Sequence, residues 1–320
     1  MKRIAFGLVL GLALLCGVAA ADPDPALGVA PRKVTVGMYV NHVYNVDVKG
    51  NQFSVDFYIW FRWEGDDLKP IDSFELANGR ITAKSGLSKK VFGKENYASI
   101  RVLATITKFW DMRRYPLDDH TLAIEIEDSD TDTRVALYEA DSENAKISPD
   151  LRVPGWEVVG TRSRATTYTY ATNYGDVSLG KGHASTYARY RFEISVERPG
   201  IGRFLKVFFG LFLSAMISWC AFWVRPKESS PRVSLGVGAA FAAAAVTLTI
   251  NNSLPDTNAL TMADKLMMLT LGVIVASVVE TILALTLAAR GKEALQQKLD
   301  RICAFGFPIF YVVMLVIIVV

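Results

Sequence analysis

Residues 201–224 read IGRFLKVFFGLFLSAMISWCAFWV, a predominantly apolar run in an otherwise mixed chain. A helix needs about 20 predominantly apolar residues to cross the hydrocarbon core of a bilayer. Three further segments of similar character follow, at residues 233–250, 262–289 and 302–320. We therefore expect four membrane-spanning helices, which form a transmembrane domain over residues 199–320.

The composition of the whole chain agrees with a membrane protein. Of its 320 residues, 51% are hydrophobic and only 21% are charged, which excludes a disordered chain and is unusual for a soluble enzyme. The formal net charge is only +3, so we expect no nucleic-acid partner. The three cysteines and three histidines lie far apart in the sequence, so we expect no cofactor held by them.

The N-terminal residues have the pattern of a secretory signal. Two basic residues precede an apolar run from Ile4 to Val18, and three alanines then precede Asp22. Such a run is too short to span a bilayer comfortably, and the small residues after it are typical of a cleavage site. We expect residues 1–21 to be a signal peptide, so that the following segment lies outside the cytoplasm.

The region 22–198 contains no segment long and apolar enough to cross a membrane. In Phe53, Val55 and Phe57, apolar residues occupy every second position, which is the period of a half-buried strand. The expected strands are residues 33–44, 52–63, 100–107, 120–127, 156–161 and 185–196. Many strands without a helical period between them predict an extracellular antiparallel β-sandwich of immunoglobulin-like type.

Positive charge near the ends of the spans predicts their orientation. Connectors 225–228 and 290–293, together with Lys298 and Arg301, hold most of the flanking Lys and Arg, whereas connector 254–260 has none. The positive-inside rule places the first and third connectors in the cytoplasm. An exported sandwich requires the same topology. We therefore expect a multi-pass protein of the plasma (inner) membrane with an extracellular or periplasmic N-terminal domain.

The second span carries a stripe of residues on one helical face. Steps of four, three, four, three and four residues join Ser234, Gly238, Phe241, Ala245, Leu248 and Asn252. If several copies surrounded an axis, Phe241 and Leu248 would form apolar rings, which can gate a pore by dewetting. The alternative is that Gly and Ala simply allow helices to pack closely, and the stripe alone favours this alternative.

Four motifs occur in order along the chain. They are residues 37–39 with 61–63, RRYPLD at 113–118, ISWCAFW at 217–223, and Leu254-Pro255 with Leu260-Thr261. Together they resemble, over residues 33–320, the bacterial pentameric ligand-gated ion channels, a branch of the Cys-loop receptor superfamily that lacks the disulfide. This resemblance implies a homopentamer with a central pore, opened by an extracellular small molecule or by protons.

The same resemblance implies that the stripe of the second span lines the pore, with Phe241 near a central hydrophobic gate. The cytoplasmic mouth then corresponds to Glu228 and Arg232. A ring of Glu favours cations and a ring of Arg favours anions. The family tolerates a basic residue at the position of Arg232 in cation channels, so we expect small inorganic cations to permeate. Membrane lipid is the other expected partner.

The resemblance also places three loops between the sandwich and the bundle, where binding is transmitted to the pore. The implied gating residues are Asp47, Tyr115, Pro116, Asp118, Arg198 and Pro255. An arginine between Asp47 and Asp118 would pair with both carboxylates and orient both loops. The alternative is that these are solvated surface charges of little energetic weight.

Ligand binding is expected between neighbouring subunits, in an aromatic box that holds a cation over ring faces. The candidate residues are Trp60, Trp63, Tyr168, Tyr170, Tyr174 and Tyr187. The tyrosines lie in or beside the polar stretch 166–185, which resembles the capping loop of the family's ligand site. The alternative for this stretch is a solvated, tyrosine-rich hairpin.

Two acidic features allow more than one interpretation. Glu280, within the third span, is either a proton sensor or a structural residue at an interface, because a carboxylate in a span is costly and faces protein or water. The calcium-loop spacing is mimicked by Asp128, Asp130, Asp132 and Glu139. Thr133 occupies the position where such a loop needs Gly, so coincidence is the favoured interpretation and we expect no metal site.

Two other classes of function compete with a channel. The first is an enzyme, which we do not expect because the sequence contains none of the common catalytic motifs. The second is a membrane-anchored extracellular binding or sensor module without channel activity. An anchor needs one helix rather than four, and it does not need the stripe centred on Phe241. The channel therefore explains more of the sequence.

Overall fold

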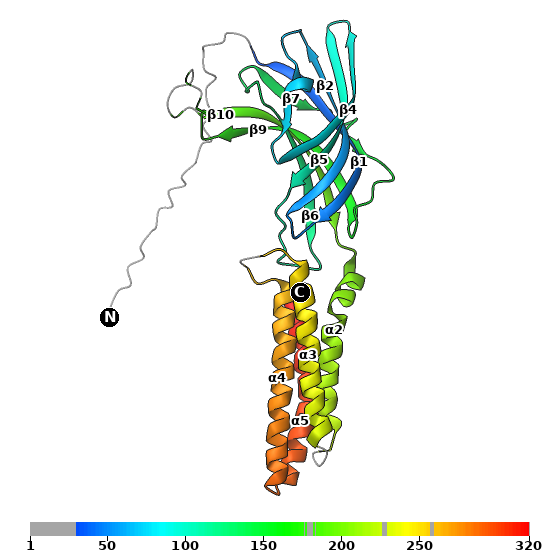
Figure 1. Ribbon diagram of the computed structural model, residues 1–320, viewed down its shortest axis with the longest axis vertical. Coiled ribbons are helices and arrows are strands. Elements are labelled where there is room, and N and C mark those ends of the chain that lie inside the picture. The colour runs from blue at the N-terminus through cyan, green and yellow to red at the C-terminus, as the bar shows by residue number, and fades with distance from the viewer. Residues whose placement is uncertain are drawn as a thin grey trace, which may run out of the picture.

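The computed structural model describes residues 30–175, 177, 182, 184–225, 229–256 and 259–319. A β-domain stands end-on above a bundle of long helices (Figure 1). The expected signal peptide, residues 1–21, lies outside the described residues.

Two sheets form the β-domain, as the sequence predicts. The larger contains, in order, β4 (Gly79–Phe92), β5 (Glu95–Thr107), β2 (Gln52–Glu64), β1 (Arg32–Asp47) and β7 (Ala136–Ala140), and β8 (Lys146–Ile147) also pairs with β1. The smaller contains β3 (Phe74–Leu76), β6 (Asp119–Asp128), β10 (Ser185–Glu197) and β9 (Glu157–Tyr170). Most pairings are antiparallel, but β7 and β8 join β1 in parallel. A short helix, α1 (Pro70–Ser73), precedes β3.

The strand bounds differ from the expected ones in two places that matter for function. Strand β4 is absent from the sequence-based prediction because almost all of its side chains are exposed, which leaves no alternation to detect. Strand β9 continues to Tyr170, so residues 166–170 of the expected capping loop are in fact paired with β10. The connection between the two strands is correspondingly shorter than predicted.

The core of the sandwich comes from alternate positions on the facing strands. Side chains that are almost fully buried there are Val36, Met38, Val40, Phe57, Ile59, Phe61, Leu122, Ile124, Ile126, Tyr190, Phe192 and Ile194. Because neighbouring positions on a strand point to opposite faces, the residues between them are directed away from this core. The two outer faces therefore carry the polar and charged side chains.

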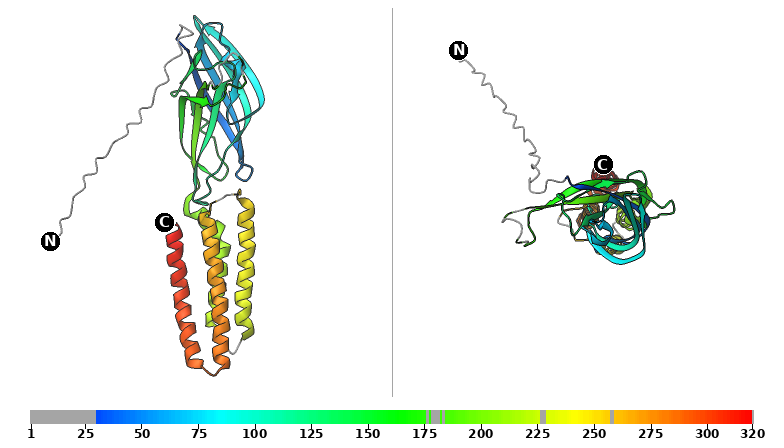
Figure 2. Two further views of the ribbon diagram at one scale, coloured as in Figure 1. Left: turned by 90° about the vertical axis from the view of Figure 1, so that its left-hand side faces the viewer. Right: turned by 90° about the horizontal axis from the view of Figure 1, so that it is seen from above.

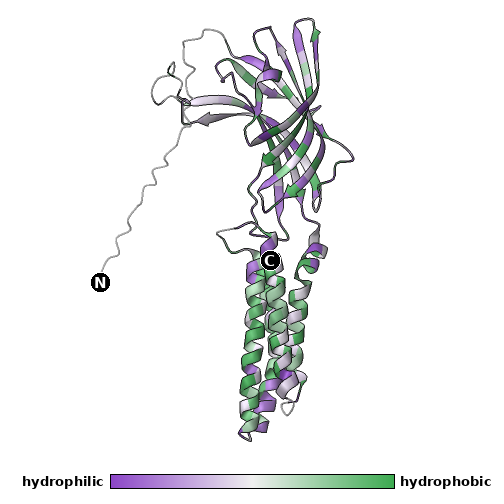
Figure 3. Ribbon diagram, viewed as in Figure 1, coloured by the Kyte–Doolittle hydropathy of each residue, from purple (hydrophilic) through white to green (hydrophobic). Residues whose placement is uncertain are grey.

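Four helices are long and apolar enough to cross a membrane, and Figure 3 shows their apolar character. They are α2 (Gly200–Cys220), extended by the 3-10 turn η2 (Ala221–Trp223), then α3 (Ser229–Ser253), α4 (Met262–Ala289) and α5 (Glu293–Val319). The spans expected at 233–250 and 302–320 thus begin earlier than predicted. Hydropathy detects only the apolar part of a helix, whereas the first turns of α3 and α5 are polar.

Helix α3 lies on one side of the bundle and α5 on the opposite side. Helix α3 packs against α2 and α4, whereas α5 packs mainly against α4 and η2. Figure 2 shows α3 and α5 at the two edges, with the other helices between them. One face of α3 is therefore left without a partner from its own chain.

Candidate functional site

The unpartnered face of α3 is the stripe identified in the sequence. All six of its residues are exposed, Phe241 to 75% and Leu248 to 64% of their surface. The buried residues of the same helix are Arg232, Gly236, Ala239, Ala243 and Ile250. At about 100° per residue these lie roughly 140–200° around the helix from Ser234, so the two faces are opposite.

Small residues account for this rotation of α3. A Cβ atom added at Gly236 would lie only 2.7 Å from Cγ2 of Val278 on α4. A Cβ atom added at Gly210 of α2 would lie 2.7 Å from Cγ2 of Val246 on α3. By contrast, a Cβ at Gly238, within the stripe, meets no atom within 4 Å. Close packing and an open stripe thus occur together, on opposite faces of one helix.

Arg232, which the sequence analysis expects at the mouth of a pore, is buried within the bundle of its own chain. None of its side-chain surface is exposed. Its Nη2 donates to Glu280 at 2.9 and 3.2 Å and to Asp300 at 2.5 Å, and its Nη1 donates to Asp300 at 3.1 Å. Because Arg232 lies about 160° around the helix from Ser234, it faces the bundle rather than the stripe. Glu228, the other expected mouth residue, lies outside the described residues.

Glu280, for which the sequence allows either a proton sensor or a structural residue, is paired with an arginine. It lies level with the first turn of α3, at the end of the bundle away from the β-domain, and its carboxylate accepts hydrogen bonds from Arg232. Asp300 of α5 is part of the same cluster and also accepts a hydrogen bond from Gln296. Of the two interpretations, this geometry supports the structural one.

A buried ion pair lies where the β-domain meets the bundle. Arg198 Nε donates to Asp118 Oδ1 at 2.7 Å, and Nε2 of His120 lies 2.8 Å from Asp118 Oδ2. The Arg198 guanidinium lies 4.0 Å from the centre of the Trp156 ring and 5.1 Å from that of Tyr115. Burial alone would raise the pKa of Asp118, but the hydrogen bond with His120 and the charge of Arg198 hold this pKa below its usual value.

Asp47 does not share this ion pair, contrary to the expectation from the sequence. It is exposed, and its carboxylate accepts a hydrogen bond at 2.8 Å from the backbone of Gly50 within the turn between β1 and β2. The carboxylate of Asp47 therefore stabilises the turn between β1 and β2 and does not pair with Arg198. The second partner of Asp118 is therefore His120, which the sequence analysis missed.

Two hydrogen bonds to backbone carbonyls join the domains beside this pair. Lys49, in the turn between β1 and β2, donates to the carbonyl of Asn252 at 3.4 Å. The amide of Met262, the first residue of α4, donates to the carbonyl of Arg113 at 2.8 Å. The loop of Arg113 also contains Tyr115 and a cis Pro116. Both ends of the segment that joins α3 to α4, which contains Pro255, are thus held by the β-domain.

The four candidate tyrosines come together at the free end of β9 and β10. The ring of Tyr170 has its centre 4.7 Å from that of Tyr168, 5.6 Å from that of Tyr174 and 5.9 Å from that of Tyr187. A cavity of about 350 Å³ is lined by Glu75, Glu127, Ser129, Tyr170, Tyr174 and Tyr187. Aromatic rings and carboxylates thus surround one space.

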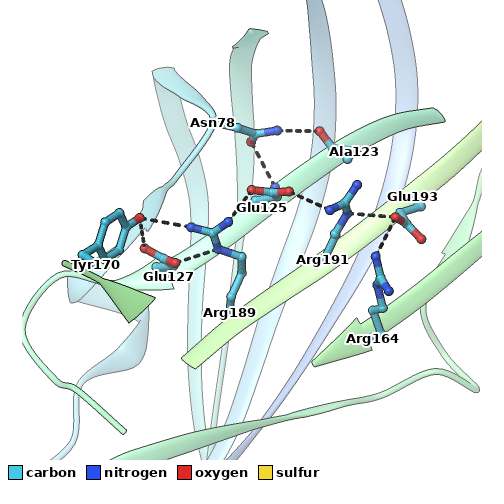
Figure 4. A network of polar contacts seen from close by, with 9 residues as sticks. All are labelled: Asn78, Ala123, Glu125, Glu127, Arg164, Tyr170, Arg189, Arg191 and Glu193. Carbon is cyan, nitrogen blue, oxygen red and sulfur yellow. Dashed lines mark hydrogen bonds and ion pairs between the residues drawn. The ribbon is translucent and has the colours of Figure 1, made fainter. Parts of the chain in front are cut away.

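A network of ion pairs supports the tyrosine cluster from beneath (Figure 4). Arg189 donates to Glu127 at 2.6 Å, to Glu125 at 2.8 Å and to the hydroxyl of Tyr170 at 3.0 Å. Burial and the hydrogen bond to Glu127 raise the pKa of Tyr170 to about 12. Burial and the charges of Glu127, Asp128 and Asp130 raise the pKa of Glu75. Two carboxylates thus line the cavity, and that of Glu127 is paired with Arg189.

The chain is similar in sequence to known proteins. The chain is 21% identical over 314 residues, 91% of its length and 83% of the relative, to a protein named proton-gated ion channel from Gloeobacter violaceus. It is 20% identical over 267 residues, 75% of its length and 50% of the relative, to a gamma-aminobutyric acid receptor subunit epsilon from Rattus norvegicus. A gamma-aminobutyric acid receptor subunit beta-like from Drosophila melanogaster is 26% identical over 158 residues, 49% of this chain and 29% of that one. No family model matches the chain.

The chain belongs to the Cys-loop superfamily of pentameric ligand-gated ion channels. It is a multi-pass membrane protein whose N-terminal β-domain is extracellular, as the sequence predicts. The Arg232 cluster therefore lies at the cytoplasmic end of the channel's helices. All three relatives are named as channels or receptors, which agrees with the expectation that the chain is not an enzyme.

The two candidate tryptophans do not join the tyrosine cluster within one subunit of the channel. Trp63 is only 9% exposed and belongs to the core of the sandwich. Trp60 lies on the outer face of the larger sheet, where its Nε1 donates to Asp141 at 3.0 Å. Its ring covers Gly37 so closely that an added Cβ would lie 2.3 Å away. The alternation along β2 that predicts the strand also separates these residues from the cavity.

The calcium-loop spacing has no counterpart in the structure. Asp128 accepts the backbone amides of Asp130 and Thr131 at 2.9 and 3.0 Å and so holds a turn. Asp132 pairs with Arg134 at 2.6 Å, and Glu139 pairs with Lys33 at 2.6 Å, away from that turn. Within the described residues no cluster of acidic, His or Cys side chains could hold a metal ion.

The Asp118–Arg198 pair predicts a definite pH dependence of stability. A carboxylate whose pKa is depressed in the folded state stabilises the fold above the unfolded value, here 3.8, and loses this effect as pH falls through the folded value. We expect Asp118→Asn to destabilise the channel by about 3–5 kcal/mol at neutral pH, because a buried guanidinium loses its partner. The difference from wild type should shrink only below pH 3.8.

Thermal melting of the purified channel between pH 3 and pH 7 measures this difference. Asp72→Asn is the matched control, since it removes a carboxylate from an exposed pair with Lys89 that contributes less than about 1 kcal/mol. Equal effects of the two substitutions would contradict the account of the buried pair.

Proposed function

We propose that five copies of this chain surround a central pore lined by α3, and that binding in the β-domain opens it. The observation that carries the proposal is the open stripe of α3, opposite the face that packs against α2 and α4. A helix with small residues on its packed face and an exposed stripe ending in Ser234 and Asn252 suits a position around an aqueous axis. A membrane-anchored binding module gives no reason for such a face.

The proposed gate consists of the apolar rings of the stripe. In a ring of five subunits, Phe241 and Leu248 would each contribute five side chains to the axis. Narrow apolar rings expel water and so block ions without a physical plug. Because most of the surface of both side chains is exposed in the subunit, they are free to form such rings.

We propose that the permeant ions are small cations. Helix α3 contains one ionisable residue, Arg232, and this residue is buried between two carboxylates. The stripe itself therefore carries no positive charge that would favour anions.

Binding is proposed to reach the gate through the three contacts at the domain boundary. The ion pair between Asp118 and Arg198 joins the β-domain to the residue two positions before α2. The contacts of Lys49 and Arg113 act on the end of α3 and the start of α4. A movement of these loops would therefore displace the helix that bears the stripe.

The ligand is proposed to be a small organic cation, such as an amine, bound in the tyrosine cavity. Ring faces attract a cation, and the carboxylate of Glu75 favours it electrostatically. Protons are the second candidate, supported by the raised pKa of Glu75 and by the name of the relative from Gloeobacter violaceus.

Phe241→Ala tests the pore assignment. Removing the ring should weaken dewetting, so we expect spontaneous current or activation at lower stimulus, recorded in oocytes or planar bilayers during pH steps and addition of amines. Phe209→Ala is the matched control, because Phe209 is an exposed phenylalanine of α2 outside the stripe. Silence of wild type and both variants, with surface expression verified, would favour the anchored binding module.

Glu75→Gln tests the ligand site. We expect about a tenfold loss of sensitivity to a primary alkylamine, equivalent to about 1.4 kcal/mol, since one carboxylate of the cavity is neutralised without change of shape. Glu64→Gln, at the exposed end of β2, is the control. Dose–response curves that shift equally for the two variants would argue against this cavity, and a shift confined to proton activation would identify protons as the ligand.

A further inference from the structure

We infer that Glu280 and Asp300 set the charge selectivity of the channel, although neither lies on the stripe, by holding the guanidinium of Arg232 away from the ion path. This inference rests on the proposed function in one respect, namely that α3 lines the pore. It concerns two positioning residues on α4 and α5, which act through Arg232.

The positive charge of Arg232 lies next to the proposed pore. Arg232 is two residues before Ser234, the first residue of the stripe, and belongs to the first turn of α3. An arginine side chain is long and flexible, so a rotation at this position can carry its charge around the helix end. In a pentamer, five such charges would gather at the cytoplasmic entrance and attract anions.

In the structure, the guanidinium of Arg232 points into the bundle, away from the proposed pore entrance. Glu280 reaches Arg232 from α4 and Asp300 reaches it from α5, so two carboxylates from different helices bind one guanidinium. The backbone carbonyl of Val224, after η2, lies 3.4 Å from Nη1 and completes a ring of partners from each part of the bundle. Gln296 donates to Asp300 and steadies it.

The cost of burying an unpaired charge explains why the two carboxylates determine where the Arg232 side chain lies. A fully buried guanidinium is tolerated only when it is paired, and loss of its partners leaves an uncompensated charge in a dry environment. Without Glu280 and Asp300, the partner left to Arg232 among the described residues is the carbonyl of Val224, at 3.4 Å. The side chain would then turn toward water, which at this level of the proposed pentamer is the cytoplasmic entrance of the pore.

Reversal potentials in asymmetric NaCl test the inference. We expect the wild type to reverse near the sodium equilibrium potential and the Glu280→Gln/Asp300→Asn double variant to shift toward the chloride potential. Adding Arg232→Gln to the double variant should return the reversal potential to the wild-type value. The matched control is Glu293→Gln, which neutralises an exposed carboxylate at the start of the same α5 and should shift nothing.

Three outcomes would overturn the inference. The first is an unshifted double variant. The second is a triple variant that keeps the shift, which would mean that the carboxylates act on permeant ions directly. The third is an equal shift in Glu293→Gln. If the double variant does not reach the surface, Asp300→Asn alone should show a smaller shift, and Arg232→Gln/Asp300→Asn should show none.

A measurement on the wild-type channel keeps the test independent of folding of the variants and of pore activity. Phenylglyoxal reacts with accessible guanidinium groups, and mass spectrometry locates the product. In membranes treated from the cytoplasmic side, Arg301, which is exposed, should be modified and Arg232 should not. Modification of wild-type Arg232 would overturn the inference. Absence of current from every protein would instead contradict the proposed function, while the labelling result would still decide whether Arg232 is sequestered.

Discussion

A guanidinium group buried between three helices constrains the whole transmembrane domain. Arg232 can be buried at this cost only where Glu280 and Asp300 meet it, and those residues come from α4 and α5. The pairing therefore fixes the rotation of α3 about its own axis at the cytoplasmic end, and Gly236 fixes it again one turn further on, against Val278. Because the rotation of α3 is fixed, the stripe from Ser234 to Asn252 faces away from its own subunit.

The opposite end of the bundle is organised by a second buried ion pair. Asp118 and Arg198 join the β-domain to α2, while the contacts of Lys49 and Arg113 hold the segment between α3 and α4. The ion pairs of Arg232 thus hold the cytoplasmic half of α3, and Lys49 of the β-domain contacts its extracellular end. Such an arrangement allows the extracellular end of α3 to move while its cytoplasmic end keeps its orientation.

The sequence predicts most of the architecture, because both periodicities are strong signals. Alternation identifies the long inner strands, hydropathy identifies the four spans, and steps of three and four residues identify the stripe. Contacts between residues that lie far apart in the sequence cannot be predicted from these periodicities. Arg232 lies 48 residues from Glu280 and 68 from Asp300, so nothing local in the sequence shows that they meet. For the same reason the sequence correctly groups the tyrosines, which lie near one another along the chain, and fails to find Glu75 and Arg189 beneath them.

The central claim is that the stripe of α3 faces an aqueous pore and that its opposite face does not. A cysteine scan of α3 tests this most directly, in a background where Cys220 and Cys303 are replaced. A cationic methanethiosulfonate reagent should change the current at the positions of Ser234, Gly238, Phe241, Ala245, Leu248 and Asn252. It should have no effect at the positions of Gly236, Ala239, Ala243 and Ile250, which are buried or packed against α4. Reactivity on the packed face, or without a helical period, would contradict the account.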